Sequence, residues 1–373
     1  HHLLQTVTMN SVYQLGFGQA AREISVDNLP VQGYIPEWLQ GTLQRNGPGT
    51  FQVGQQQYRH WFDGLAMLHK FTFAGGQVSY ANKYLESRAY DEAMANERIA
   101  YSEFATDPCR SLFQRVSSVF SPKVTDSAKV SIAKIADRFM ALAETPIQVQ
   151  FDPETLKTVG VFNYEERLNG QMTTVHPHFD HKRDEVFNVV TRYHRISHYN
   201  TYKMVNGGSP TLVSSVPAAK PAYMHSFGMS ENYIILTEFP LVVNPVSLLL
   251  WLKPYIENFK WEPKRGTPFW VVNRHNGEVV GRYDADPFFA FHHINAFERD
   301  DELIVDLAAY PDADIINAFY LNRLRDADLE LPHGNLRRYR LPLTGGRDGL
   351  NGGRASYETI SDACMELPHF DYG

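Results

Sequence analysis

Three histidines far apart in the chain each stand in a short apolar segment that resembles a β-strand. They are His176 within residues 172–180, His225 within 222–228 and His292 within 288–295. The spacings of 49 and 67 residues bring no two of them onto one helix or one hairpin. Each spacing is close to one propeller blade, which is about 40–50 residues of four strands. Separate imidazoles that a closed β-fold brings to one point indicate a metal site with nitrogen ligands.

The composition is that of a soluble globular protein with a large core. The chain has 373 residues, of which 43% are hydrophobic and 21% charged. Its net charge of −7 comes without a basic run, which argues against nucleic acid as a partner. The first residues do not resemble a signal peptide, and the longest apolar stretch, Val246–Leu252, is too short to span a membrane. Two cysteines allow one disulfide, but nothing indicates an oxidising compartment.

Short strand patterns between turn signals dominate the chain, and few segments favour a helix. Strands are predicted over residues 42–45, 68–73, 78–81, 139–143, 186–190, 233–236, 269–272 and 303–307. Hairpin turns are predicted at residues 74–77, 206–209 and 274–277. Helices are predicted over residues 91–100, 109–120 and 314–325. No linker divides the chain, so we expect one all-β domain over residues 1–373 with helical insertions.

Two glutamates in apolar surroundings are candidates for the acceptors that ligand histidines need. Neutral imidazole binds iron, zinc, copper or nickel, and its second ring nitrogen commonly donates to a carboxylate. Glu144 and Glu366 both follow apolar residues, and a glutamate there is costly to bury unless it is paired. Each histidine is also compatible with a packing role, and each glutamate with a surface position. The residues alone therefore leave both interpretations open.

A series of motifs resembles the carotenoid cleavage oxygenase family. The motifs are Trp38–Gly49, His60–His69, Ala143–Thr145, Val175–Pro177, His225–Gly228, Phe291–Glu298 and Glu366–Pro368, in that order over about residues 30–373. The segments 107–109 and 292–298 are most similar to the β-carotene oxygenase and retinoid isomerohydrolase branch. The resemblance implies a seven-bladed β-propeller, with helical and loop insertions that form a cap over Fe(II) on its axis.

The resemblance also implies which residues form the iron site. His176, His225 and His292 match the first three of four ligand histidines, and His292 rather than His293 is the match in the Phe-His-His run. Glu144 and Glu366 match carboxylates that accept hydrogen bonds from His225 and His292 respectively. These carboxylates would orient the rings and offset the charge of the iron.

The family pattern also includes a fourth histidine and a third glutamate, which this sequence does not contain. His333 and His369 do not match the missing ligand. We expect the chain to be a fragment without the last blade or blades, because a propeller that lacks its final strands has an unpaired edge. The alternative is an open ring with a three-histidine site.

An apolar substrate tunnel follows from the same resemblance. Phe104, Tyr223 and Phe291 occupy family positions near the metal and the cleft, although each is equally compatible with ordinary core packing. In contrast, the pattern around residues 61–63, Trp-Phe-Asp, fits a tight structural turn with a buried aromatic ring.

Two segments are candidates for peripheral contact with a membrane surface. The first is an apolar patch of five consecutive residues before Lys253, namely Leu248, Leu249, Leu250, Trp251 and Leu252. The second is the predicted helix 109–120, which has one apolar face. Packing on the propeller is the alternative for both segments. We expect a cytoplasmic protein that associates peripherally with membranes.

The function implied by the resemblance is a non-haem Fe(II) dioxygenase that cleaves a conjugated C=C bond of a carotenoid or apocarotenoid. Its cofactor would be Fe(2+), its co-substrate O2, and its products aldehydes or ketones. One alternative is a dioxygenase that cleaves stilbene-type phenolics, which would require a buried Tyr/Lys pair. Others are a non-oxidative retinoid isomerohydrolase and, if the chain truly ends at Gly373, a non-catalytic propeller that binds apolar ligands.

Overall fold

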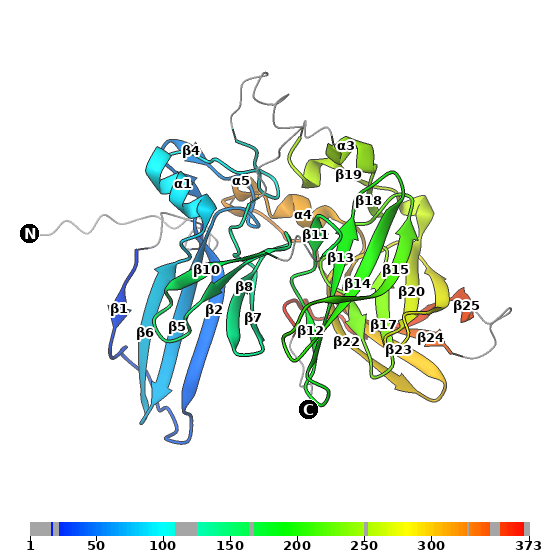
Figure 1. Ribbon diagram of the computed structural model, residues 1–373, viewed down its shortest axis with the longest axis horizontal. Helices are drawn as coiled ribbons and strands as arrows, with labels where there is room; N and C mark the ends of the chain where they lie inside the picture. Colours follow the sequence, from blue (N-terminus) through cyan, green and yellow to red (C-terminus); the bar gives the residue numbers. More distant parts are fainter. Residues whose placement is uncertain are drawn as a thin grey trace, which may run out of the picture.

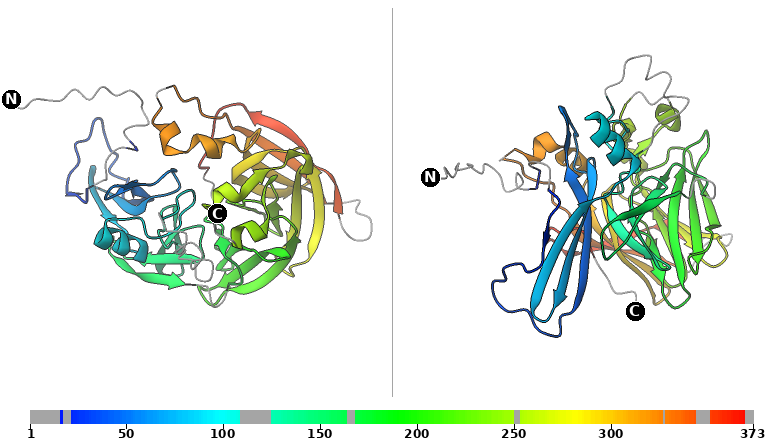
Figure 2. Two further views of the ribbon diagram at one scale, coloured as in Figure 1. Left: turned by 90° about the horizontal axis from the view of Figure 1, so that it is seen from above. Right: turned by 60° about the vertical axis from the view of Figure 1, so that its left-hand side comes forward.

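Antiparallel β-sheets make up most of the protein, which confirms the all-β prediction. The computed structural model describes residues 16–17, 22–108, 125–163, 168–249, 253–326, 328–343 and 351–368. In this part of the chain, five sheets of four or five strands are built almost entirely from consecutive strands (Figure 1). Seen from above, the sheets lie around a common centre (Figure 2).

The first two sheets each contain four strands. The first has the order β1-β6-β5-β2, with β1 (Ser25–Val26), β6 (Gln77–Tyr84), β5 (Leu65–Ala74) and β2 (Gly41–Thr50). The second has the order β10-β9-β8-β7, with β10 (Thr158–Asn163), β9 (Ile147–Phe151), β8 (Arg138–Leu142) and β7 (Ser131–Ile135). Two small two-stranded sheets accompany the five sheets, β3 (Gln52–Val53) with β4 (Gln56–Gln57) and β18 (Leu241–Val243) with β19 (Phe259–Trp261).

The other three sheets carry or border the candidate histidines. The third consists of β11 (Met172–Thr173), β13 (Glu185–Arg192), β14 (Ser197–Val205) and β15 (Thr211–Ala218), with β12 (His178–Asp180) also paired to β13. The fourth consists of β16 (Gly228–Met229), β17 (Tyr233–Thr237), β20 (Thr267–Asn273), β21 (Val279–Ala285) and β25 (Asn351–Arg354). The fifth consists of β22 (Phe289–Arg299), β23 (Glu302–Tyr310), β24 (Asn335–Pro342) and β26 (Ser356–Ser361). In each of these three sheets the first strand is an edge strand, namely β11, β16 and β22. The candidate histidines lie in or next to these edges.

The turns form where the sequence predicts them. Gly75 and Gly76 join the paired residues Ala74 and Gln77, and both have positive φ (55° and 75°), as the favoured two-residue hairpin requires. The turns predicted at 206–209 and 274–277 join β14 to β15 and β20 to β21. The predicted strands all fall within observed strands, apart from Ala143 just beyond β8.

One predicted helix begins and ends earlier than expected. Helix α1 spans Arg88–Asn96 rather than 91–100. Its start is fixed by Ser87, whose side chain accepts the N–H of Tyr90, and by the Asp126 carboxylate, which accepts the first two helical N–H groups. Its end is fixed by Glu97, which adopts a left-handed conformation (φ 49°).

The single helix predicted over residues 314–325 is wrong. The segment forms two short helices, α4 (Asp314–Ala318) and α5 (Leu321–Leu324). Tyr320 between them is extended because it pairs with His60 in an isolated β-bridge. This contact crosses most of the chain, so local sequence does not report it. The predicted helix 109–120 lies outside the described residues.

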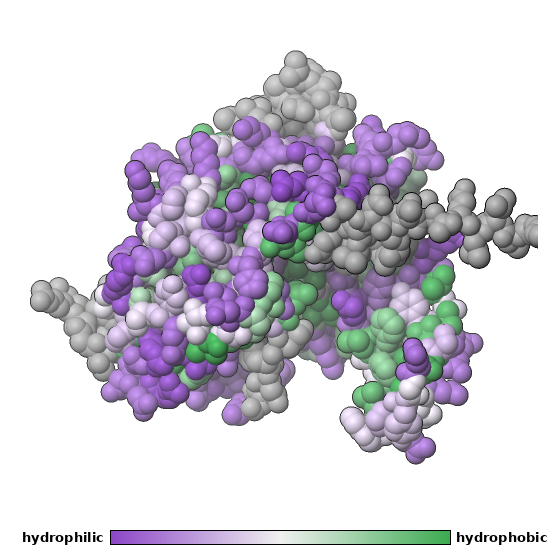
Figure 3. Space-filling model, turned by 180° about the vertical axis from the view of Figure 1, so that it is seen from behind, coloured by the Kyte–Doolittle hydropathy of each residue, from purple (hydrophilic) through white to green (hydrophobic). Residues whose placement is uncertain are grey.

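The described helices lie at one end of the sheets. Helices α1, α4, α5 and α3 (Pro245–Leu249) gather at the top of Figure 1. None of the described helices is both long and apolar enough to cross a membrane. On the face shown in Figure 3, hydrophilic residues predominate and hydrophobic residues form smaller patches among them.

Hydrogen bonds between consecutive sheets fix their inner edges. These bonds come from buried or half-buried polar side chains and end on backbone carbonyls of the neighbouring sheet. They run from Asn46 to Ser131 (3.2 Å), from Ser131 to Val175 (2.6 Å), from His178 to Phe227 (2.8 Å) and from Ser226 to Phe291 (2.7 Å). Together they connect all five sheets around the centre.

Candidate metal centre

The three sequence-distant histidines meet at the centre of the ring of sheets. His176 precedes β12, His225 precedes β16, and His292 lies in β22. One ring nitrogen from each lies within 4.8 Å of those of the other two. The ring centroids are 4.8–5.1 Å apart, and His225 and His292 are both buried. The structure therefore brings together the three residues that the sequence singles out.

An irregularity in β22 positions His292. The pairing with β23 shifts register between Ala290 and His293 and again between His293 and Asn295. Bulges of this kind re-aim side chains and are common next to functional sites. Neighbouring strand residues point to opposite faces, so His293 turns away from the centre. Its two ring nitrogens lie 2.9 Å from Ser226 Oγ and 2.8 Å from Thr237 Oγ1.

His178 and His293 are neutral structural residues. The Nε2–H of His178 donates to the Phe227 carbonyl at 2.8 Å. Burial lowers the pKa of His178 to about 4 and the pKa of His293 to about 3. Both rings therefore stay uncharged near neutral pH and serve as hydrogen-bonding links between sheets.

Carboxylates lie behind two of the three central rings. Glu144 Oε1 is 2.7 Å from Nδ1 of His225, and Glu366 Oε2 forms a hydrogen bond with Nδ1 of His292. An ionised carboxylate can only accept, so the proton of each ring is on Nδ1. Each Nε2 then carries the lone pair of its ring, as a metal ligand requires. These are the two pairings that the resemblance implies.

Each of these carboxylates also faces a buried tyrosine. The hydroxyl of Tyr223 donates to Glu144 Oε1 at 2.6 Å. Burial and then Glu144 raise the pKa of Tyr223 well above its usual value, so the phenol keeps its proton. Burial and the neighbouring Glu366 raise the pKa of Tyr310 in the same way. Tyr310 ends the apolar strand β23, and nothing in its local sequence indicates this position.

The donor set fits a metal cation. The Nε2 atoms of His176 and His225 are 3.1 Å apart. Two nitrogens bound to one metal at about 2.1 Å, at a right angle, would be separated by about 3.0 Å. Two lone pairs at this distance repel each other unless a proton or a cation lies between them. The ring of His292 converges on the same point. One cation can accept the lone pairs of all three rings, whereas one proton can join only two of them.

A mostly apolar cavity adjoins His225 and Glu144. Its walls include Phe62, Phe104, Met172 and Tyr255. The Phe62 ring stacks on His225 with centroids 6.0 Å apart, so this residue borders the site as well as forming the predicted turn. Phe104 contributes directly to the cavity, as a tunnel residue would.

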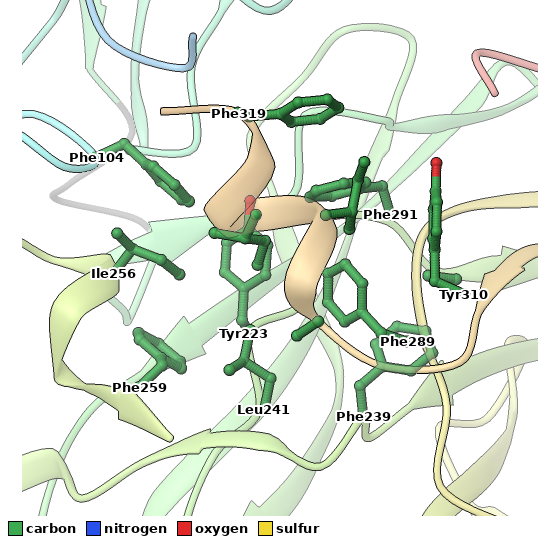
Figure 4. Close-up of a cluster of buried hydrophobic side chains, with 14 of the residues drawn as sticks. Phe104, Tyr223, Phe239, Leu241, Ile256, Phe259, Phe289, Phe291, Tyr310 and Phe319 are labelled. Atoms are coloured by element: carbon green, nitrogen blue, oxygen red, sulfur yellow. The ribbon is translucent and has the colours of Figure 1, made fainter. Parts of the chain in front are cut away.

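The other two predicted tunnel residues belong to the aromatic cluster around the site. Tyr223 packs against Phe104 with ring centroids 5.7 Å apart, and Phe291 packs against His225 at 5.6 Å. Figure 4 shows these three aromatic residues in one cluster with Phe289 and Phe319. Tyr223 and Phe291 therefore pack behind the cavity wall and the central histidine rings.

The sequence did not reveal that the cavity also contains a buried ion pair. Glu103 and Lys129 both contribute to its wall, and their side chains are 1% and 6% exposed. In the sequence, each of the two appears only as a charged residue within an apolar segment. The same pattern is typical of an exposed position on a strand.

The remaining predicted positions fall partly outside the described residues. Leu248 packs partly against the core, but the side chain of Leu249 and all of Leu250, Trp251 and Leu252 are outside the described part. His369 is outside it as well. His333 is exposed, and its ring donates to the Asp362 carbonyl.

Comparisons with known proteins identify the family of this chain. A family model described as "Retinal pigment epithelial membrane protein" (RPE65) matches residues 17–373. A carotenoid isomerooxygenase of Galleria mellonella is 34% identical over 369 residues, covering 92% of this chain and 70% of the relative. A β,β-carotene 15,15′-dioxygenase of Gallus gallus is 35% identical over 331 residues, covering 81% and 62%. A mitochondrial carotenoid-cleaving dioxygenase of Macaca fascicularis is 35% identical over 333 residues, covering 81% and 58%.

Solved structures share the fold. A mutant of the Synechocystis apocarotenoid oxygenase superposes with a TM-score of 0.79 at 23% identity, covering 96% of this chain and 74% of that one. A chimera of this oxygenase with RPE65 superposes with a TM-score of 0.77 at 24% identity, covering 95% and 73%. The chain thus spans roughly 58–74% of the proteins that it resembles.

The first prediction concerns the choice of histidines. His176→Ala, His225→Ala and His292→Ala should each lower the iron content, after chelation and anaerobic reloading, from near one per chain to near zero. His178→Ala and His293→Ala should lower thermal stability but keep their iron, because their rings bond to protein groups. Metal analysis and a melting curve on each variant check this. Loss of iron from His293→Ala with retention in His292→Ala would reverse the assignment.

The second prediction concerns the carboxylates. Glu144→Gln and Glu366→Gln should weaken iron affinity by roughly 10–100-fold, because an amide neither charge-balances nor orients an imidazole as a carboxylate does. Titration against a competing chelator measures this. Glu298→Gln is the matched control, since Glu298 lies on β22 but bonds to Ser230 and Asn232. Equal affinity in all three variants would assign Glu144 and Glu366 a purely structural role.

Proposed function

This chain belongs to the carotenoid oxygenase family, and from that premise we propose that it is a non-haem iron dioxygenase. Its substrate is a carotenoid or apocarotenoid, and the reaction splits one conjugated C=C bond with O2. Both the σ and π bonds break, and each carbon receives one oxygen atom, so one alkene and one O2 give two carbonyl products. The observation that carries the proposal is the convergence of three imidazoles beside an apolar cavity.

Iron is the cofactor that this chemistry requires. Bound Fe(II) supplies the redox activity by which O2 reacts with an alkene, an activity that zinc lacks. His176, His225 and His292 would hold the ion through neutral nitrogens. Glu144 and Glu366 would offset its positive charge and keep the two rings they contact in one tautomer.

The remaining residues position the polyene and keep water away. Phe62 and Phe104 border the cavity, and the aromatic cluster behind them packs at centroid distances of 5–6 Å. Such walls hold a rigid hydrocarbon by apolar contact alone. Rate acceleration then depends mainly on fixing one double bond next to the metal, with no side chain acting as acid or base.

We also propose that the five sheets belong to one domain with the seven-bladed propeller architecture implied by the sequence. Sheets of four or five strands, almost all of them antiparallel, around a centre support this architecture. In a propeller the first strand of each blade lies nearest the axis, and the candidate ligands precede or occupy such strands here.

Peripheral membrane association is the proposed way in which the enzyme obtains its substrate. The apolar run Leu248–Leu252 with Lys253 after it supports this, as does Val246 on α3, whose side chain is exposed. A polyene is nearly insoluble in water, so extraction from a lipid surface avoids its transfer through solvent. A cytoplasmic location remains our expectation.

The test of the proposed activity follows oxygen as well as polyene. The iron-loaded chain, incubated with β-carotene in detergent under ¹⁸O2, should lose polyene absorbance and yield carbonyl products that carry ¹⁸O, with one O2 consumed per polyene. His225→Ala should abolish the reaction, and the exposed His275→Ala should leave it unchanged. In parallel incubations with a retinyl ester and with a stilbene, isomerisation and hydrolysis of the ester without oxygen uptake would indicate an isomerohydrolase, and cleavage of the stilbene alone would indicate a phenolic dioxygenase. Binding of the polyene without turnover of any substrate would indicate a non-catalytic protein.

The membrane proposal predicts a difference between two assay formats. Leu249→Ser/Trp251→Ser should reduce co-sedimentation with liposomes and slow turnover of liposome-embedded β-carotene severalfold. Turnover of detergent-solubilised β-carotene should remain nearly unchanged, because the site itself is intact. An equal loss in both formats would indicate a packing defect, and the membrane role of this segment would then be abandoned.

A further inference from the structure

A buried ion pair faces the apolar cavity beside the candidate metal centre. Lys129 Nζ is 2.5 Å from Glu103 Oε2. Both residues border the same cavity as Phe104, Glu144 and His225. Lysine and glutamate are almost never this deeply buried without a partner. A buried pair also contributes little net stability, because removing both charges from water offsets their attraction. A purely stabilising role is therefore a poor explanation for this pair.

The hydrogen bonds of the pair leave capacity on both groups. Glu103 Oε1 accepts from Thr125 Oγ1 at 2.6 Å, and Lys129 Nζ also donates to the Ser127 carbonyl at 3.3 Å. An ammonium has three protons, and Lys129 makes two hydrogen bonds within the described part of the chain. A carboxylate has about four acceptor positions. The pair thus offers a ligand in the cavity one donor and at least one acceptor.

The position of the pair is fixed relative to the metal centre. Thr125, which bonds to Glu103, accepts through its carbonyl from Thr145 Oγ1 at 3.1 Å. Thr145 directly follows Glu144, whose carboxylate holds His225. A substrate group bound at Lys129 and Glu103 would therefore lie at a set distance from the central rings.

We propose that Lys129 and Glu103 bind a neutral hydroxyl group of a polyene substrate and so determine which double bond lies at the metal centre. This rests on the proposed function, in which a polyene occupies the cavity. A hydroxyl accepts a hydrogen bond from the ammonium and donates one to the carboxylate, so it uses both members of the pair. A carbonyl or ether oxygen can use only Lys129. A ligand carboxylate would be repelled by Glu103 and Glu144.

The charge state of the pair favours a neutral ligand. Burial raises the pKa of Glu103 to about 7, and the Lys129 ammonium acts in the opposite direction. An additional anion in the cavity would raise that pKa further and weaken the ion pair. A hydroxyl adds no charge and leaves the pair intact.

Binding measurements test the inference independently of turnover. The probes are β-carotene, its 3,3′-dihydroxy derivative and a polyene carboxylic acid, each titrated in detergent against the iron-loaded chain by quenching of tryptophan fluorescence. The wild-type chain should bind the diol about tenfold more tightly than the hydrocarbon, the factor supplied by one net hydrogen bond of about 1.4 kcal/mol. In Lys129→Met/Glu103→Leu, which leaves no unpaired buried charge, this ratio should fall to about one.

A surface variant and a product analysis complete the test. Lys134→Met, an exposed lysine on β7 of the neighbouring sheet, should keep the tenfold ratio. Where turnover occurs, the double variant should also cleave the diol at more than one double bond. A diol preference that survives in the double variant, equal binding of diol and hydrocarbon by the wild type, or tightest binding of the acid would each overturn the inference. Hydroxyl-selective binding without any cleavage would support the inference while refuting the proposed activity.

Discussion

The site depends on hydrogen bonds that hold separate sheets at fixed distances around their common centre. No local element can bring His176, His225 and His292 together, so tertiary contacts between inner edges must do so. Ser131 bonds to the carbonyl of Val175, which directly precedes His176 in the loop between β11 and β12. Ser226, next to His225, bonds to the backbone beside His292. Because these bonds are short and wholly or partly buried, a displacement of one sheet would break them and leave polar groups unsatisfied. The same bonds therefore stabilise the ring of sheets and set the separation of the imidazoles.

Histidines at the centre have two distinct roles, and geometry separates them. The imidazole of a ligand must present a lone pair, which requires that its other nitrogen carry the proton, and Glu144 and Glu366 impose this on their partners. His178 and His293 have the opposite arrangement, since protein groups occupy the ring nitrogens that could otherwise reach a metal. Adjacent positions such as 292 and 293 can have different roles because strand residues alternate between faces.

Sequence patterns predicted those features that depend on neighbouring residues or on a motif. The apolar runs within β13 and β20 are local, as is the Gly75–Gly76 turn, so strands and turns followed directly. The set of three histidines followed from the motifs at residues 175–177, 225–228 and 291–298. The interrupted helix at Tyr320 did not follow, because its cause is a bridge to His60 some 260 residues earlier. The Glu103–Lys129 pair was missed for a similar reason: one lysine in an apolar strand pattern does not reveal whether its head group meets water or a buried carboxylate.

Charge balance connects the metal centre with the cavity. The carboxylates of Glu144 and Glu366 would together match the two positive charges of the proposed Fe(II), which three neutral imidazoles would leave uncompensated. Within the cavity wall, the ammonium of Lys129 matches the carboxylate of Glu103. In a site of low dielectric an unmatched charge would attract water or shift its pKa until it was neutral. Matching each charge locally keeps the cavity suited to a hydrocarbon, while the polar groups that remain can still recognise one hydroxyl.

Apolar walls alone would let a long polyene slide along the tunnel, because every CH group along its length makes nearly the same contacts. A single polar anchor would remove that freedom, so a cavity in which no side chain acts as acid or base could still select one double bond among many.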